Sequence, residues 1–180
     1  PFDRERYAEI RSIAAQMIAH QGEMPFEKVQ GLFCCETGYQ TPKLDTRAAI
    51  FRDDRILLVQ EKNGTWSLPG GWVDVDLSVL ENVVKEVREE AGFTVKAERL
   101  IAVQDWRKHN VTNYVYGVVK CFVLCKYESG EFQKNIETTG IGLFGRDELP
   151  IDLAVEKTSR EQILMCFDAL DNPLSPTLFD

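Results

Sequence analysis

Leu68–Phe93 reads LPGGWVDVDLSVLENVVKEVREEAGF and joins a glycine loop to an amphipathic helix. Gly70 and Gly71 lack side chains, so the backbone around them can approach a ligand closely. Beyond this loop, apolar residues recur every three or four positions, which predicts one buried helix face. The members of that face are Leu80, Val83, Val84, Val87 and Ala91. Gly92 is predicted to end the helix.

Three glutamates share a second stripe of this helix. At about 100° per residue, Glu86, Glu89 and Glu90 fall in one sector, roughly a third of a turn from the apolar face. Like charges at these spacings repel each other modestly, so the stripe is a poor stabilising pattern. Carboxylate oxygens suit Mg²⁺ or Mn²⁺, which also bind substrate phosphate oxygens. The stripe is therefore a divalent-metal site or a solvated acidic face, and the preceding glycines favour the metal site.

The spacing of these residues resembles the Nudix box. That signature reads glycine, five residues, glutamate, seven residues, and then Arg-Glu-aliphatic-x-Glu-Glu-x-Gly-aliphatic. The matching positions are Gly71, Lys85-Glu86-Val87, Glu89-Glu90 and Gly92-Phe93. Two positions depart from the signature, because Leu77 replaces the first glutamate and Lys85 replaces the arginine. Lysine supplies a point charge in place of a planar fork, so it should orient the neighbouring glutamate less firmly.

The resemblance implies an α/β fold, the Nudix α/β/α sandwich with a mixed sheet, and a Mg²⁺ or Mn²⁺ cofactor. It implies metal ligands at Glu86, Glu89 and Glu90, with the carbonyl of Gly70 as another. In the implied reaction, water attacks one phosphorus of a pyrophosphate and two monophosphates are released. The candidate catalytic residues are Glu86, Glu89 and Glu137, and either Glu86 or Glu137 could accept the proton of the water. Glu137 is alternatively a solvated loop acid, since Gly140 occupies the place where many members carry a second acid.

The candidate substrate-binding residues are Arg47, Gly71, Trp72 and His109. The forked donors of Arg47 suit phosphate, although this residue could equally pair with a surface acid. Trp72 follows the glycine loop and is the preferred tryptophan for stacking on a base, whereas Trp66 and Trp106 are expected in the core. His109 lies in an expected turn, where it contacts either a ligand or only solvent.

Composition restricts the class of protein. The 180 residues, 44% of them hydrophobic, suffice for one domain with an appendage. We expect a cytoplasmic protein without a membrane partner, because no apolar run reaches about 18 residues and the charged start is not a secretory signal. A net charge of −8 makes nucleic acid an unlikely partner. Five cysteines lack paired metal-ligand spacing and are expected as buried thiols, namely Cys34, Cys35, Cys121, Cys125 and Cys166.

Three regions are expected along the chain. Residues 1–42 form a helical extension with helices at 3–20 and 25–37, too small for a core of its own and suited to a homodimer contact. Residues 43–172 form the Nudix domain, with strands near 44–52, 56–60, 65–68, 94–106, 114–127 and 141–144 and a closing helix over 155–170. Residues 173–180 form an extended tail. The extension resembles that of a Nudix subgroup that includes CDP-choline pyrophosphatases and also lacks the first glutamate of the box.

The favoured function is metal-dependent hydrolysis of a nucleoside diphosphate linked to another moiety, of the CDP-choline or ADP-ribose type. An RNA exonuclease or RNA-end hydrolase using the same site is one alternative. A catalytically silent nucleotide-binding module is the other, because Leu77, Lys85 and Gly140 all depart from the family pattern. Metal-dependent turnover distinguishes an enzyme from such a module.

Overall fold

The computed structural model describes residues 2–21, 25–33, 41–111 and 117–180. The chain divides into two compact units, Pro1–Thr41 and Pro42–Asp180. No helix within the described ranges is both long and apolar enough to cross a membrane.

The first unit contains two helices, α1 (Phe2–Gln21) and α2 (Phe26–Phe33). They pack through the buried side chains of Ala15, Ala19 and Val29. Both predicted helices are therefore confirmed. The expected stop signals Gly22 and Gly38, and the predicted continuation of the second helix beyond residue 33, lie outside the described residues.

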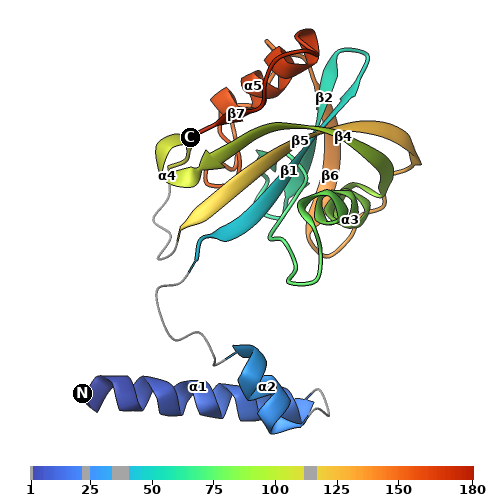
Figure 1. Ribbon diagram of the computed structural model, residues 1–180. Coiled ribbons are helices and arrows are strands. Elements are labelled where there is room, and N and C mark those ends of the chain that lie inside the picture. Colours follow the sequence, from blue (N-terminus) through green and yellow to red (C-terminus); the bar gives the residue numbers. More distant parts are fainter. Residues whose placement is uncertain (1, 22–24, 34–40, 112–116) are drawn as a thin grey trace. The chain divides into compact units, whose positions relative to one another are not determined.

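The second unit is built on a seven-stranded sheet (Figure 1). Its strands are β1 (Lys43–Arg52), β2 (Arg55–Glu61), β3 (Trp66–Ser67), β4 (Phe93–Asp105), β5 (Val118–Gly130), β6 (Thr138–Phe144) and β7 (Leu178–Phe179). They are ordered β3-β2-β1-β5-β4-β7, and β6 pairs with β2. The β1–β5 and β4–β7 pairs are parallel and the other pairs are antiparallel, so the sheet is mixed as predicted.

Two helices cover the sheet, α3 (Val79–Ala91) on one face and α5 (Arg160–Asp171) on the other, while the short α4 (Trp106–His109) follows β4. Alternating residues of a strand point to opposite faces. Along β1, Ala48 and Ile50 accordingly pack in the α3 cluster, and Ala49 packs in the α5 cluster. The predicted α/β/α sandwich is confirmed.

Helix α3 begins with a capping box and ends at a left-handed glycine. The Ser78 hydroxyl accepts from the Glu81 N–H, the Glu81 carboxylate accepts from the Ser78 N–H, and Gly92 has φ 70°. The prediction for Leu80 is wrong, since this residue is 57% exposed. The buried arc of the helix is rotated toward its polar stripe and includes Asn82, Glu86 and Glu90. By helical spacing Leu80 falls between Val87 and Ala91 on that arc, so its exposure follows from its place in the first turn, at the end of the helix.

The closing helix begins later than predicted, at Arg160 instead of residue 155. Ser159 caps its start by accepting from the Gln162 N–H, so the preceding residues are free to form a turn. In that turn the N–H groups of Lys157 and Thr158 both donate to the carbonyl of Ala154. An apolar pattern alone cannot distinguish this turn from a first helical turn.

The C-terminal tail contributes to the sheet. Leu178 pairs with Ala102 and Phe179 with Val103, so β7 lies parallel to β4 at the sheet edge. The Asp180 carboxylate accepts from the Asp105 N–H at 2.7 Å. A two-residue strand leaves no periodic signal in the sequence, so an extended tail was all that could be predicted.

The predicted buried thiols are confirmed where they are described. Cys121, Cys125 and Cys166 are buried free thiols, whereas Cys34 and Cys35 lie outside the described residues. Two of the tryptophans also belong to the core. Trp66 packs edge-to-face on Phe144 at 5.0 Å between ring centroids, and Trp106 is only 6% exposed.

Candidate functional site

A pocket of about 320 Å³ lies where the glycine loop, β1, β5 and α3 meet the turn before α5. Its lining contains five acidic and three basic side chains, which leaves two formal negative charges. The lining residues are Asp45, Arg47, Gly70, Gly71, Trp72, Asp74, Glu86, Glu90, Val118, Lys120, Glu137 and Lys157. A net negative, polar pocket of this kind suits a divalent cation more than an anion alone.

The glycine loop runs against β1 and leaves no room for side chains. Thr46 N–H donates to the Gly71 carbonyl at 2.9 Å, which draws the two segments together. A Cβ at Gly70 would lie 1.9 Å from the Thr46 carbonyl oxygen, and φ at Gly70 is +144°. A Cβ at Gly71 would lie 2.8 Å from the Glu86 Oε2 atom. Gly70 is therefore required by close packing against the β1 backbone, whereas a side chain at Gly71 would displace the Glu86 carboxylate.

Two glutamates of α3 are buried at this wall. The Glu90 side chain is 5% exposed in the fold and accepts from the Gly70 N–H at 2.8 Å. Burial raises the pKa of Glu90 to about 7, against partial lowering by the charge of Arg47. Burial also raises the pKa of Glu86 above its ordinary value. Burial thus disfavours the charged form of both carboxylates even with Lys85 and Arg47 nearby, and a divalent metal ion would offset this effect, so the donor chemistry here fits such an ion.

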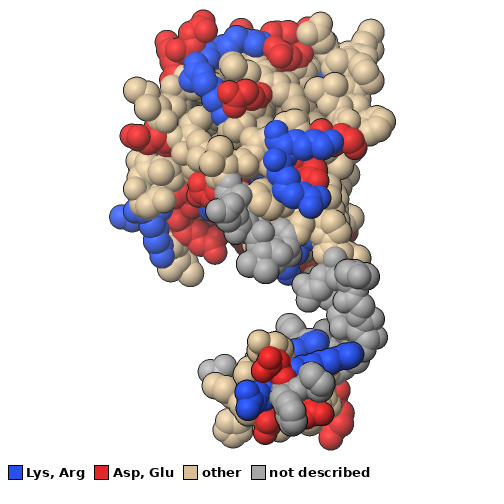
Figure 2. Space-filling model, turned by 90° about the vertical axis from the view of Figure 1, so that its left-hand side faces the viewer, with Lys and Arg blue, Asp and Glu red and all other residues tan. Residues whose placement is uncertain are grey.

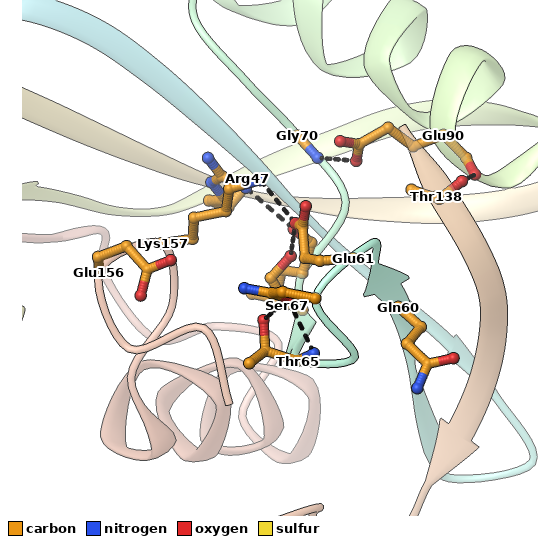
Figure 3. Close-up of polar contacts among 12 residues, drawn as sticks. Arg47, Gln60, Glu61, Thr65, Ser67, Gly70, Glu90, Thr138, Glu156 and Lys157 are labelled. Atoms are coloured by element: carbon orange, nitrogen blue, oxygen red, sulfur yellow. Dashed lines mark hydrogen bonds and ion pairs between the residues drawn. The ribbon is translucent and has the colours of Figure 1, made fainter. Parts of the chain in front are cut away.

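The loop before β6 is tied to the end of α3. The Thr138 hydroxyl donates to the Glu90 carbonyl at 2.7 Å (Figure 3). The Asn135 side-chain amide donates to Thr138 Oγ1 at 2.8 Å. The Asn135 Oδ1 atom accepts from the Glu137 N–H at 2.8 Å. These contacts place the exposed Glu137 at the pocket, where it could serve as the general base proposed from the sequence.

Glu89 is placed differently from its two neighbours. Its side chain is 54% exposed and pairs with the Lys85 ammonium at 3.2 Å, outside the pocket lining. The same ammonium lies 3.2 Å from Glu86 and 3.1 Å from Asp74. Lys85 therefore bridges three acids as a point charge. Among the described residues, no three Asp, Glu, His or Cys side chains converge in a ready-made metal site. The assignment of Glu89 as a ligand stays a prediction and requires its carboxylate to turn away from Lys85.

A buried ion cluster forms the floor of the pocket. Arg47 is 4% exposed, and its guanidinium donates to both Asp45 carboxylate oxygens at 2.8 and 2.7 Å. It also donates to the Leu68 carbonyl at 3.2 Å. Lys120, directly opposite Asp45 on the parallel strand β5, has its ammonium 3.7 Å from the Asp45 carboxylate. Arg47 thus lines the pocket and also pairs with an acid, although that acid is buried and not on the surface.

The structure brings together most of the substrate-binding residues expected from the sequence. Arg47, Gly71 and Trp72 all line the pocket, and Trp72 is 41% exposed. His109 does not line it. The His109 ring lies 3.1 Å from the Asp180 carboxylate, beside the C-terminal strand.

Five pocket residues were not identified from the sequence, among them three whose charges matter here: Asp45, Lys120 and Lys157. Asp45 could have been found, because residues two apart on a strand share a face and Arg47 was already a candidate. The only sequence signal for Lys120 is that a charged residue stands within an otherwise apolar predicted strand. Lys157 belongs to a turn that the sequence assigned to a helix, so no local signal placed it here.

Comparison with protein families matches both units of the chain. Residues 41–163 match the NUDIX domain. Residues 1–33 match a domain described as a UDP-X-like, N-terminal oligomerisation domain.

Individual proteins that are similar to this chain agree with the family matches. A provisionally named ADP-ribose pyrophosphatase of Bacillus subtilis, YjhB, is 42% identical over 180 residues, which span 99% of this chain and 86% of that protein. The crystal structure of an ADP-ribose pyrophosphatase from Streptococcus suis is 53% identical with a TM-score of 0.73, covering 78% of this chain and 100% of that one. The crystal structure of a UDP-X diphosphatase is 34% identical with a TM-score of 0.73, covering 100% of this chain and 87% of that one.

Proposed function

This chain belongs to the Nudix hydrolase family, and on that premise we propose that it is a Mg²⁺- or Mn²⁺-dependent pyrophosphohydrolase. The substrate that we propose is a nucleoside diphosphate linked to another moiety, of the ADP-ribose, UDP-X or CDP-choline type. The observation that carries the proposal is the pocket itself, which places Glu86 and Glu90 of the Nudix helix beside Arg47 and Lys157. A cytoplasmic location stays a prediction from the sequence.

In the proposed reaction, some pocket residues hold the metal ion and others accept a proton. A divalent cation held by Glu86 and Glu90, with Glu89 and the Gly70 carbonyl as further ligands, would supply charge for the phosphoryl oxygens and acidify water. Glu86 or Glu137 accepts the proton of the attacking water. Oxygen from that water bonds to one phosphorus as the bridging P–O bond breaks, and the other phosphate leaves.

We assign binding of the nucleoside base to Trp72 at the edge of the pocket. The exposed face of Trp72 offers a surface on which a base can stack. Because stacking accepts every base, this contact supports binding of a nucleotide without selecting one. The choice among adenine, uracil and cytosine therefore has to be measured.

Hydrolysis is tested by coupled phosphate release from ADP-ribose, UDP-glucose, CDP-choline and a short RNA, with and without Mg²⁺ or Mn²⁺. We expect metal-dependent turnover of at least one nucleoside diphosphate compound. Glu86→Gln should lower kcat/KM at least about 100-fold, since it removes a ligand charge and a candidate base. Glu128→Gln, an exposed glutamate near the end of β5, is the matched control. Retained metal binding without any turnover would instead support the silent nucleotide-binding module.

RNA is not favoured as a substrate. On the face in Figure 2, the acidic and basic side chains of the described residues are interspersed and form no broad basic surface. The net charge of −8 also disfavours attraction to a phosphate backbone. The RNA arm of the assay should therefore stay at background.

A homodimer contact is proposed for α1, in line with the oligomerisation-domain match. Four apolar side chains of this helix are at least half exposed: Tyr7, Ile10, Ile13 and Met17. We expect Ile10→Glu/Met17→Glu to convert the full-length protein from dimer to monomer, because burying a carboxylate in an apolar contact is unfavourable. Light scattering after size exclusion measures the mass. Gln16→Glu adds charge to another face of α1 and should leave the dimer intact, and a monomeric wild type would refute the assignment.

A further inference from the structure

We propose that Lys157 binds the diphosphate of the substrate and that the buried Lys120 is the positioning residue that presents Lys157 to the pocket. This inference rests on the proposed function and extends it to two residues of this chain that the Nudix box does not contain.

Lys157 is the cation of the pocket that is best placed to meet a substrate. Arg47 and Lys120 are 4% and 2% exposed, and the Arg47 fork is occupied by Asp45. The Lys157 side chain is 33% exposed and reaches the edge of the pocket. Its charge offsets a small part of the effect of burial, which raises the pKa of Glu90. The Lys157 ammonium therefore lies within electrostatic range of the position at which the phosphates must meet the α3 carboxylates.

Glu61 orients Lys157. The Lys157 ammonium pairs with Glu61 Oε1 at 2.6 Å, and the same oxygen accepts from the Ser67 hydroxyl at 3.0 Å (Figure 3). A lysine ammonium has three donors, so contact with one carboxylate leaves donors for a phosphate oxygen. The pair thus holds the lysine in place without saturating it.

Lys120 fixes the backbone from which Lys157 projects. Its ammonium donates to the Glu156 carbonyl at 3.0 Å and also to the Lys157 carbonyl. These carbonyls belong to the turn before α5, whose base is held independently by the Ala154 N–H donating to the Trp66 carbonyl at 2.8 Å. Losing the Lys120 contacts should therefore loosen the Glu156–Lys157 segment while leaving the base of the turn attached.

Double-mutant kinetics test both parts of the inference. Wild type, Lys157→Met, Lys120→Met and the double variant are compared with ADP-ribose at saturating Mg²⁺. We expect Lys157→Met to raise KM about tenfold, which corresponds to about 1.4 kcal/mol, with kcat changed less than about threefold. Lys120→Met should raise KM about three- to tenfold. The double variant should match Lys157→Met alone, because a positioning residue has no effect once its target is gone.

Two further variants serve as controls for the KM changes expected in Lys157→Met and Lys120→Met. Lys126→Met removes an exposed lysine of β5 and should leave KM within about twofold of wild type, since Lys126 lies outside the pocket lining. Lys120→Arg retains donors for the two carbonyls and should restore KM, and Lys120→Gln, whose shorter side chain cannot reach both carbonyls, replaces Lys120→Met if the latter fails to fold.

An unchanged KM in Lys157→Met would overturn the phosphate contact. Effects of Lys157→Met and Lys120→Met that multiply in the double variant would overturn the positioning role. Either result with an active wild type leaves the proposed function standing. A wild type inactive on every nucleoside diphosphate compound would overturn the proposed function and this inference together.

Discussion

Glu90→Gln is expected to lower hydrolysis about 100- to 1,000-fold and at the same time to stabilise the metal-free protein at pH 8. The loss of activity follows from removing a carboxylate that we assign to the divalent cation. The gain in stability follows from burial, which raises the pKa of Glu90 from 4.5 to about 7. Glutamine has no charge to desolvate and retains an oxygen that can accept from the Gly70 N–H.

The pH dependence of this stability has a definite sign. Because the folded-state pKa of Glu90 lies above the unfolded value, its protonation favours the folded state below about pH 4.5, and this contribution is lost as pH rises through 7. A shift of this size corresponds to about 3 kcal/mol. Relative to wild type, Glu90→Gln should therefore raise the free energy of unfolding by about 2–3 kcal/mol at pH 8 and by little near pH 4.5.

Urea unfolding in EDTA at both pH values measures this difference. Glu128→Gln controls for the loss of one exposed carboxylate and should show no such pH dependence. A Glu90→Gln protein that is no more stable than wild type at pH 8 would contradict the burial argument. Full activity in the same variant would contradict the ligand assignment.

Asp45→Asn is expected to destabilise the protein by about 3–5 kcal/mol. Asp45 is the acid between two buried cations, the Arg47 guanidinium and the Lys120 ammonium. Asparagine fills the same volume but leaves both charges uncompensated away from water. Removal of one member of a buried ion cluster is therefore far more damaging than removal of an exposed partner.

The chain contains a matched control for this prediction. Asp105 and Arg107 have the same spacing in the sequence and also pair, at 2.6 Å, but the Arg107 side chain is 65% exposed. Thermal and urea unfolding of Asp105→Asn should differ little from wild type, because solvent screens this pair. Equal losses of stability in the two variants would show that burial of the Asp45 cluster is not the deciding factor.

Local patterns determined the parts of the fold that depend on neighbours in the sequence. The apolar period and the terminal Gly92 predicted α3, and a strand was predicted over residues 44–52, where β1 lies. The spacing from Gly71 to Phe93 identified the family and placed Glu86 and Glu90 on one helix. Such signals are reliable because a helix or strand repeats its geometry every few residues.

Long-range packing decided what the sequence could not. Pairing of β1 with β5 joins Asp45 and Arg47 to Lys120, about 75 positions further along the chain. Pairing of the C-terminal strand β7 with β4 brings Asp180 beside His109, so the His109 ring contacts this carboxylate and does not line the pocket.

Burial, too, is a property of the folded chain. Helical periodicity placed Glu86 and Glu90 on a polar stripe, but only the packing of α3 against the glycine loop desolvates them and separates them from the exposed Glu89. The sequence by itself therefore determined the family, the sandwich and the carboxylates. The tertiary structure decided which charges are buried, which are paired and which face the pocket, because those properties depend on contacts between segments with no local signal for one another.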